Sequence, residues 1–222
     1  MNLLAIEQSA LNSSSALLRD CEVISSKSWN HQENSSENLF TVIPDLLSSG
    51  GITLRDIDAY AVGLGPGSFS GLRISLSAAN TLALPEKKKV VGIPSAHALA
   101  MAVLEEFGVE TVAVIGDARR KMLWAGVFAI NNGVVTPVMP LELVTLQDLA
   151  SKISGADMAV SPDWDRIGEH LENMALPTKL LQESRTPAAG ILGRLAFHNL
   201  QSCAAALPLA PLYMHPPVSP RK

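Results

Sequence analysis

The sequence predicts an α/β fold of two tandem lobes, each with its strands and helices in the order βββαβαβα. Two observations carry this prediction: each half opens with three strands joined by short turns, and short apolar runs then alternate with helical periodicity. Hydrophobic residues make up 47% of the 222 residues, which is enough for a sizeable core. We place the boundary near Gly108, with an N-terminal lobe over residues 1–107 and a divergent C-terminal lobe over residues 108–222.

The first lobe is expected to open with three strands. Leu3 to Glu7 is a short apolar run that fits one strand. Residues 15–19 and 22–28 fit the two arms of a hairpin that turns near Asp20. Three strands therefore come before the first helix.

That helix is expected over residues 36–49, where apolar residues recur at helical spacing. Ser35 and Ser36 are candidates for its N-cap, and Gly50 follows as a stop signal. Pro44 lies inside the helix and predicts a kink or a broken turn, because proline has no N–H to donate.

Strands and helices then alternate to the end of the first lobe. Residues 59–64 form a compact apolar strand, residues 65–69 a glycine-rich loop and residues 70–84 a helix rich in small side chains. A further strand is expected over residues 90–93 and a further helix over residues 95–107.

The second half repeats this order. Strands over 111–116 and 121–130 lead to a third strand from Val134, which Pro137 and Pro140 are expected to shorten or end. The remaining expected elements are helix 146–153, strand 158–160, helix 162–171, strand 178–181 and helix 188–205. Two such units are typical of the paired ribonuclease-H-like lobes of the actin-like, sugar kinase and Hsp70 ATPase superfamily.

Charge and cysteine content narrow the function classes. A net charge of −4 gives no electrostatic reason for tight, unaided binding to nucleic acid, so we expect any RNA contact to come through a partner. Cys21 and Cys203 form no CxxC pair, which fits a reducing cytosol. No apolar run reaches the roughly 18 residues of a membrane span, and the first residues lack the basic segment of a signal peptide. The sequence predicts a cytoplasmic protein.

The glycine-rich loop has two interpretations. Gly65, Gly67 and Ser68 lie between a strand and a helix, where backbone N–H groups could hold a phosphate. The spacing matches neither the dinucleotide-binding nor the P-loop pattern, and Phe69 stands where a nucleophile elbow needs serine. A tight turn that lets the strand and helix pack closely is favoured over a phosphate cradle.

Candidate metal ligands and catalytic groups are sparse. The five histidines include no pair spaced one helical turn apart, so no metal site is predicted. His97 is expected to be a packed or surface residue. Asp117, followed by the basic run 119–121, fits either a carboxylate beside a cationic patch at the mouth of the cleft or a solvated turn.

Several segments of the chain can be compared with known families: 4–9, the block 57–74, 92–95, 116–119 and the C-terminal 211–213, with Gly65 to Ile74 as the most specific part. Together they resemble the TsaB (YeaZ) family of bacterial tRNA threonylcarbamoyladenosine biosynthesis proteins. The resemblance covers most of the chain and is strongest in the first 120 residues.

The resemblance implies a non-catalytic subunit. Members of the family pair with a catalytic paralogue, TsaD, which transfers threonylcarbamoyl to adenosine 37 of ANN-decoding tRNAs. The resemblance also implies the ATPase TsaE as a further partner, a homodimer when alone, tRNA contact only through the complex, and no cofactor of its own, with ATP or ADP at the partner interface left open. In the family, the first two helices dock on the partner. The interface candidates that follow are Leu39, Phe40, Ile43, Leu47, Ile74 and Ala78.

Two other functions stay open. One is a nucleotide-using enzyme of the same fold, a kinase or ATPase, with Gly65 to Ser68 on phosphate and Asp117 near a metal. The other is a metallopeptidase.

Overall fold

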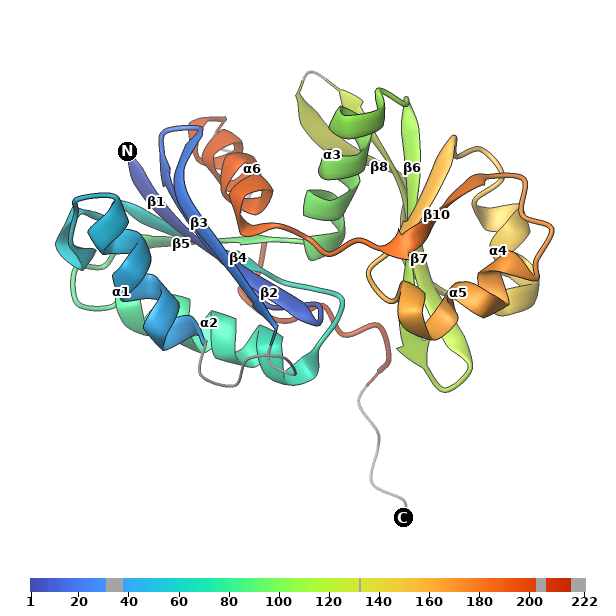
Figure 1. Cartoon of the computed structure of the whole chain (residues 1–222), viewed down its shortest axis with the longest axis horizontal. Helices are drawn as coiled ribbons and strands as arrows, with labels where there is room; N and C mark the ends of the chain where they lie inside the picture. The colour runs from blue at the N-terminus through green and yellow to red at the C-terminus, as the bar shows by residue number, and fades with distance from the viewer. Residues whose placement is uncertain (31–37, 132, 203–206, 217–222) are drawn as a thin grey trace, which may run out of the picture.

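The computed structural model describes residues 1–30, 38–131, 133–202 and 207–216, which form two five-stranded sheets with helices around them (Figure 1). The first sheet contains β1 (Asn2–Glu7), β2 (Asn12–Arg19), β3 (Glu22–Asn30), β4 (Ala59–Gly63) and β5 (Lys89–Ile93). Its order is β3-β2-β1-β4-β5, in which the first three strands are antiparallel and β4 and β5 run parallel to β1. This is the ribonuclease-H-like arrangement.

The second sheet repeats the first. It contains β6 (Thr111–Arg119), β7 (Met122–Asn131), β8 (Val134–Val144), β9 (Met158–Ser161) and β10 (Lys179–Ser184). Its order is β10-β9-β6-β7-β8, with β6, β7 and β8 antiparallel and β9 and β10 parallel to β6. The predicted α/β class and the repeated unit are confirmed.

Helices cover both faces of each sheet. They are α1 (Leu39–Ser49), α2 (Phe69–Ala83), α3 (Ser95–Phe107), α4 (Leu146–Lys152), α5 (Trp164–Glu172) and α6 (Ala189–Gln201), with a short 3₁₀ turn η1 (Leu54–Asp56). The pair α1 and α2 covers the outer face of the first sheet, and α4 and α5 lie on the outer side of the second (Figure 1). None of the described helices is long and apolar enough to cross a membrane.

The two inner helices lie in a core that both sheets share. Helix α3 contacts β6 and β7 of the second sheet, whereas α6, the last helix of the chain, contacts β1 and β2 of the first. Arg194 of α6 donates two hydrogen bonds to the Glu105 carboxylate of α3, at 2.9 and 2.8 Å. All strands up to residue 107 belong to the first sheet, but α6 returns from the second half to cover it.

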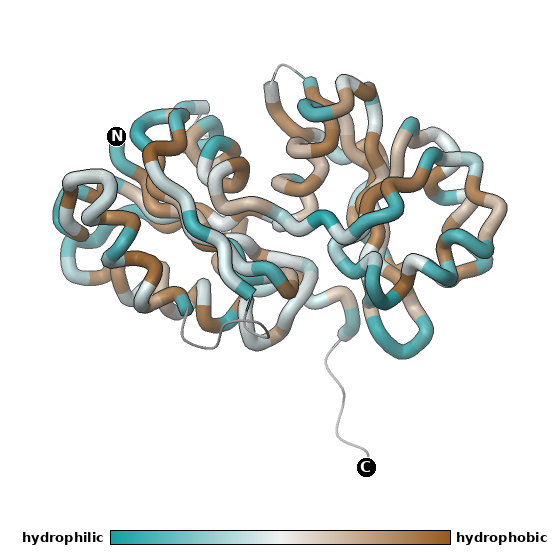
Figure 2. Tube along the Cα trace, in the orientation of Figure 1, coloured by the Kyte–Doolittle hydropathy of each residue, from teal (hydrophilic) through white to brown (hydrophobic). Residues whose placement is uncertain are grey.

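The sequences of β1 and β4 are nearly continuous apolar runs because both faces of these strands are buried. Both are buried on both faces along nearly their whole length, as expected for parallel strands covered by helices on either side. Hydrophobic and hydrophilic residues instead alternate along α1 and α2 (Figure 2). That alternation leaves one face of each helix on the sheet and the other in solvent.

The first helix begins later than expected. Asn38 is the N-cap of α1: its side chain accepts from the N–H groups of Phe40 and Thr41, and Thr41 Oγ1 accepts from the Asn38 N–H. Ser35 and Ser36, the predicted caps, lie outside the described residues. The helix continues through Pro44 to Ser49.

The prediction that prolines end the third strand of the second lobe is wrong. Strand β8 continues through Pro137 and Pro140 to Val144. It lies at the edge of its sheet, so a residue without an N–H can be accommodated there, and the β7–β8 register shifts near Val127 and Phe128.

Candidate functional site

The glycine-rich loop lies where the carboxyl ends of three parallel strands meet. It follows β4, and it packs against Ser9 just after β1 and Ser95 just after β5. The Ser68 N–H donates to the Ser9 carbonyl at 2.7 Å, and the Ser95 N–H donates to the Gly65 carbonyl at 2.8 Å. Ligands of open α/β sheets bind at the carboxyl ends of the strands, so this edge is a candidate ligand site.

A buried glutamate lies at the centre of this edge. Glu7 ends β1, and its carboxylate accepts from the Ser9 N–H and from Ser95 Oγ, both at 2.7 Å. Ser95 Oγ in turn accepts from the Gly65 N–H at 3.0 Å. Burial raises the pKa of Glu7, and the hydrogen bonds from Ser9 and Ser95 act against that rise. Glu7 was not among the candidate site residues predicted from the sequence, although a carboxylate at the end of an apolar strand is a signal for such a site.

Close packing accounts for two of the glycines. A Cβ on Gly67 would overlap the Ser9 carbonyl oxygen, and a Cβ on Gly71 would overlap the Gln8 carbonyl oxygen. Gly67 also has a φ of 157°. These glycines let the loop and the start of α2 lie directly on the segment after β1.

Two donors of this loop are used within the chain. The Gly65 N–H donates to Ser95 and that of Ser68 to Ser9, while those of Gly71 and Leu72, in the first turn of α2, donate back to Ser68. A phosphate cradle needs N–H groups that point at an open site. The inward bonds of Gly65 and Ser68 fit a tight turn, and phosphate binding by Gly65, Gly67 and Ser68 stays a prediction.

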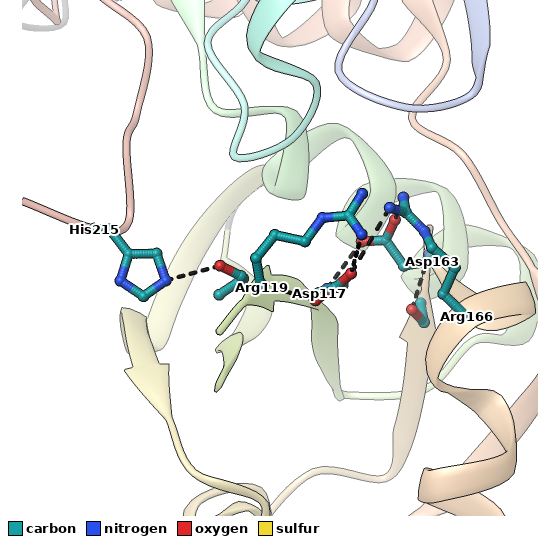
Figure 3. Close-up of polar contacts among 7 residues, drawn as sticks. Asp117, Arg119, Asp163, Arg166 and His215 are labelled. Atoms are coloured by element: carbon teal, nitrogen blue, oxygen red, sulfur yellow. Dashed lines mark hydrogen bonds and ion pairs between the residues drawn. The ribbon is translucent and has the colours of Figure 1, made fainter. Parts of the chain in front are cut away.

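Asp117 belongs to a different cluster, in the second lobe (Figure 3). Its carboxylate lies 3.2 Å from Arg119 and 3.7 Å from Arg166, measured from Oδ2 to the guanidinium nitrogens. Its N–H donates to Asp163 Oδ2 at 2.9 Å, and Asp163 is itself paired with Arg166. Asp117 is therefore neutralised by two arginines of its own lobe. No cluster of three or more His, Cys, Asp or Glu side chains suited to a metal ion occurs among the described residues.

The six interface candidates divide into two sets. Phe40 of α1 and Ile74 of α2 are exposed, by 70% and 46%. The other four are buried in the core under the two helices: Leu39, Ile43, Leu47 and Ala78. Leu39, Ile43 and Leu47 are spaced by four along α1 and share the face that packs on the sheet, and Ala78 lies on the buried side of α2. Burial in this chain makes these four less suited to direct contact than Phe40 and Ile74, and partner contact by any of the six stays a prediction.

The exposed positions that sequence reasoning missed lie at the two ends of α2. Phe69 begins the helix and Leu84 follows it, and both are exposed. Sequence periodicity finds the apolar stripe of a helix but does not tell which apolar residues stay outside it. Phe40, Phe69, Ile74 and Leu84 are thus the apolar side chains that α1, α2 and their ends present to solvent, and we call them the docking face.

Comparison with known families places the chain near one group of tRNA-modification proteins. The family model described as "TsaD: tRNA N6-adenosine threonylcarbamoyltransferase" matches residues 22–179. The chain is 29% identical to the tRNA threonylcarbamoyladenosine biosynthesis protein TsaB of Bacillus subtilis over 160 residues, which are 72% of this chain and 69% of that protein. It is 29% identical to TsaB of Escherichia coli over 170 residues, 74% of this chain and 72% of that protein.

Similar solved structures come from the same group of proteins. YeaZ from Pseudomonas aeruginosa superposes with a TM-score of 0.81 at 26% identity, covering 96% of this chain and 99% of that one. A second crystal structure, described as an uncharacterized protein with similarity to peptidase YeaZ from Pseudomonas aeruginosa, superposes with a TM-score of 0.83 at 25% identity over the same shares. Both likenesses extend over the two lobes.

Proposed function

Because the chain belongs to the TsaB (YeaZ) family, within the larger family described by the TsaD model, we propose that it is a non-catalytic subunit of threonylcarbamoyladenosine formation in tRNA. Its role is to dock on TsaD and activate it for threonylcarbamoyl transfer to adenosine 37 of ANN-decoding tRNAs. The docking face supports this proposal more than any other feature.

The docking face has the chemistry of a protein interface. Phe40 and Ile74 project from two helices that pack on the same core cluster, and Phe69 and Leu84 extend the apolar surface along α2. Aromatic residues in such patches are typical anchors of interfaces. Serine at position 77, on the exposed side of α2, is small enough to let a second helix come close.

The polar groups at the strand ends support a structural role. Glu7 accepts hydrogen bonds from Ser9 and Ser95 inside the fold, and Asp117 is held between two arginines. A general base or nucleophile needs a group that can reach a substrate. In this proposal catalysis belongs to TsaD.

The remaining parts of the proposal concern the assembly. TsaE joins the complex, and tRNA is contacted through the complex in the cytoplasm. When TsaD is absent the docking face forms a homodimer, because the same apolar surface can cover itself but cannot serve two partners at once. ATP or ADP, if bound, lies at the partner interface.

The test uses single charges on the docking face. Phe40→Asp and Ile74→Asp each place a carboxylate in the centre of the apolar contact, where burial costs several kcal/mol, and should abolish co-purification with TsaD. Both side chains are exposed, so the chain should stay folded. Val138→Asp makes the same change at an exposed apolar residue of β8 and should leave binding intact. Binding of both docking-face variants at the level of the unaltered chain would refute the docking face.

A further inference from the structure

Residues 211–215 cross from the first lobe to the second, and we call them the clasp. At one end the Leu212 N–H donates to the Leu64 carbonyl, just after β4, at 2.8 Å. At the other end His215 Nε2 donates to the Ala118 carbonyl, in β6, at 2.7 Å. Figure 3 shows His215 reaching the turn that also carries Arg119. The clasp therefore joins the ends of two strands that belong to different sheets.

Between these two ends, Tyr213 holds the beginning of α2. Its ring stacks on Phe69 with the centroids 5.5 Å apart, and its hydroxyl accepts from Arg73 Nε at 3.0 Å. The Arg73 guanidinium lies 3.9 Å from the centre of the Phe69 ring. Tyr213 thus fixes two residues of the first helical turns, one of which is the immediate neighbour of Ile74.

Tyr213 is the exposed part of the clasp. Tyr213 and Phe69 are both exposed, whereas Leu212 packs against the core under α1 and α2 and Met214 against the core that both sheets share. A cavity of about 630 Å³ lies between residues 211–216 and Leu141, Glu142 and Leu143 of β8. Exposed contacts open locally more readily than buried ones, so the contacts of Tyr213 are the part of the clasp that opens first.

We propose that the clasp regulates docking: closed, it holds Phe69 and Arg73 in the positions in which the docking face fits TsaD, and open, it releases them. The inference rests on the proposed function, because the regulated surface is the docking face. Release would remove the Tyr213 hydroxyl from Arg73 and the Tyr213 ring from Phe69. The Arg73 guanidinium would keep only its contact with the Phe69 ring of the same helix, and would lie beside Ile74 in an apolar contact without its hydrogen-bond acceptor. Desolvating an unpaired cation opposes binding, so an open clasp should weaken docking. Tyr213 acts as a positioning residue in this scheme.

The test combines hydrogen–deuterium exchange with the dissociation constant for TsaD, using the full chain. Tyr213→Ala removes the stack and the acceptor and should speed amide exchange at Leu212 and at the start of α2, while weakening docking by about tenfold. Tyr213→Phe keeps the ring and removes the hydroxyl acceptor. Its amide exchange rates and its affinity for TsaD should lie between those of the unaltered chain and those of Tyr213→Ala. Leu209→Ala, an exposed position of the same segment outside the clasp, should change neither readout.

Two outcomes would overturn the inference. Unchanged exchange at Leu212 in Tyr213→Ala would show that Tyr213 does not hold the clasp. Faster exchange with unchanged affinity would show that the clasp opens without effect on docking. Failure of the proposed function is separable, because it would appear as absence of docking of the unaltered chain on TsaD, and the exchange measurement does not depend on TsaD.

Discussion

Glu7 and Ser95 are joined by a buried hydrogen bond of 2.7 Å that connects the end of β1 to the start of α3. Ser95 Oγ also accepts from the Gly65 N–H, so one hydroxyl serves a carboxylate and the glycine-rich loop together. Because α3 contacts the second sheet, this hydroxyl lies at the point where the chain leaves the first lobe for the second. The bond between the two residues therefore fixes the start of α3 to the end of β1 and, through the same hydroxyl, to the glycine-rich loop.

Replacing that hydroxyl should be costly. Ser95→Ala leaves the Gly65 N–H and one Glu7 oxygen without partners in a buried place, which should lower the free energy of unfolding by about 2–3 kcal/mol. Urea denaturation measures the change. Ser77→Ala, an exposed serine of α2, is the matched control and should stay within about 0.5 kcal/mol of the unaltered chain. Equal free energies of unfolding for the two variants would mean that the hydrogen bonds of Ser95 to Glu7 and Gly65 do not stabilise the fold.

Two glycines should respond oppositely to alanine. Gly71→Ala would place a Cβ against the Gln8 carbonyl, so we expect a loss of about 1–3 kcal/mol, even though alanine favours a helix. Gly155→Ala meets no atom within 4 Å and should be neutral or gain up to about 1 kcal/mol. Thermal unfolding of both variants decides this. A stabilised Gly71→Ala would show that the loop can move away from the segment after β1.

Local signals explain which elements were predictable. Three signals for this region can be seen within a few consecutive residues: the apolar run of β4, the glycines after it and the periodicity of α2. The predicted helix 70–84 accordingly differs from α2, Phe69–Ala83, by a single residue at each end. Strand β8 was predicted too short because its tolerance of proline depends on its edge position in the sheet. That position is set by long-range pairing.

The candidate site was less predictable for the same reason. Leu39 and Phe40 are adjacent apolar residues, and only the position of the sheet decides that the first is buried and the second exposed. The packing of α6 on β1 and β2 and the contacts of the clasp with Leu64 and Arg73 join residues more than a hundred positions apart. No periodicity or spacing within one segment carries that information.

Leu39 and Phe40, neighbours on α1, give a direct test of the docking face. Leu39→Ala removes a buried side chain and should lower the free energy of unfolding by about 2–5 kcal/mol. Phe40→Ala removes an exposed one, so stability should change by less than about 0.5 kcal/mol, while affinity for TsaD falls by at least about fivefold. Chemical denaturation and a binding titration measure the two quantities. If Leu39→Ala were as stable as the unaltered chain but no longer bound TsaD, Leu39 would belong to the docking face and not to the face of α1 that packs on the sheet.

His97 should make the fold sensitive to acid. Its ring packs on Phe128, with the centroids 5.0 Å apart, and burial lowers its pKa from 6.5 to about 4, because the charged imidazolium is poorly solvated there. The unfolded chain therefore binds a proton on this residue between about pH 6.5 and pH 4, and the folded chain does not. Stability should fall as the pH is lowered through this window, by about 2 kcal/mol between pH 7 and pH 5.

The acid sensitivity can be assigned to His97 by substitution. The raised pKa of Glu7 acts in the opposite direction, since its carboxyl takes up a proton more readily in the folded chain, so total stability alone is ambiguous. The difference in unfolding free energy between the unaltered chain and His97→Leu cancels the Glu7 contribution. That difference should shift by about 2 kcal/mol in favour of the leucine variant between pH 7 and pH 5. A difference that is constant over this range would mean that His97 titrates alike in the folded and unfolded chains.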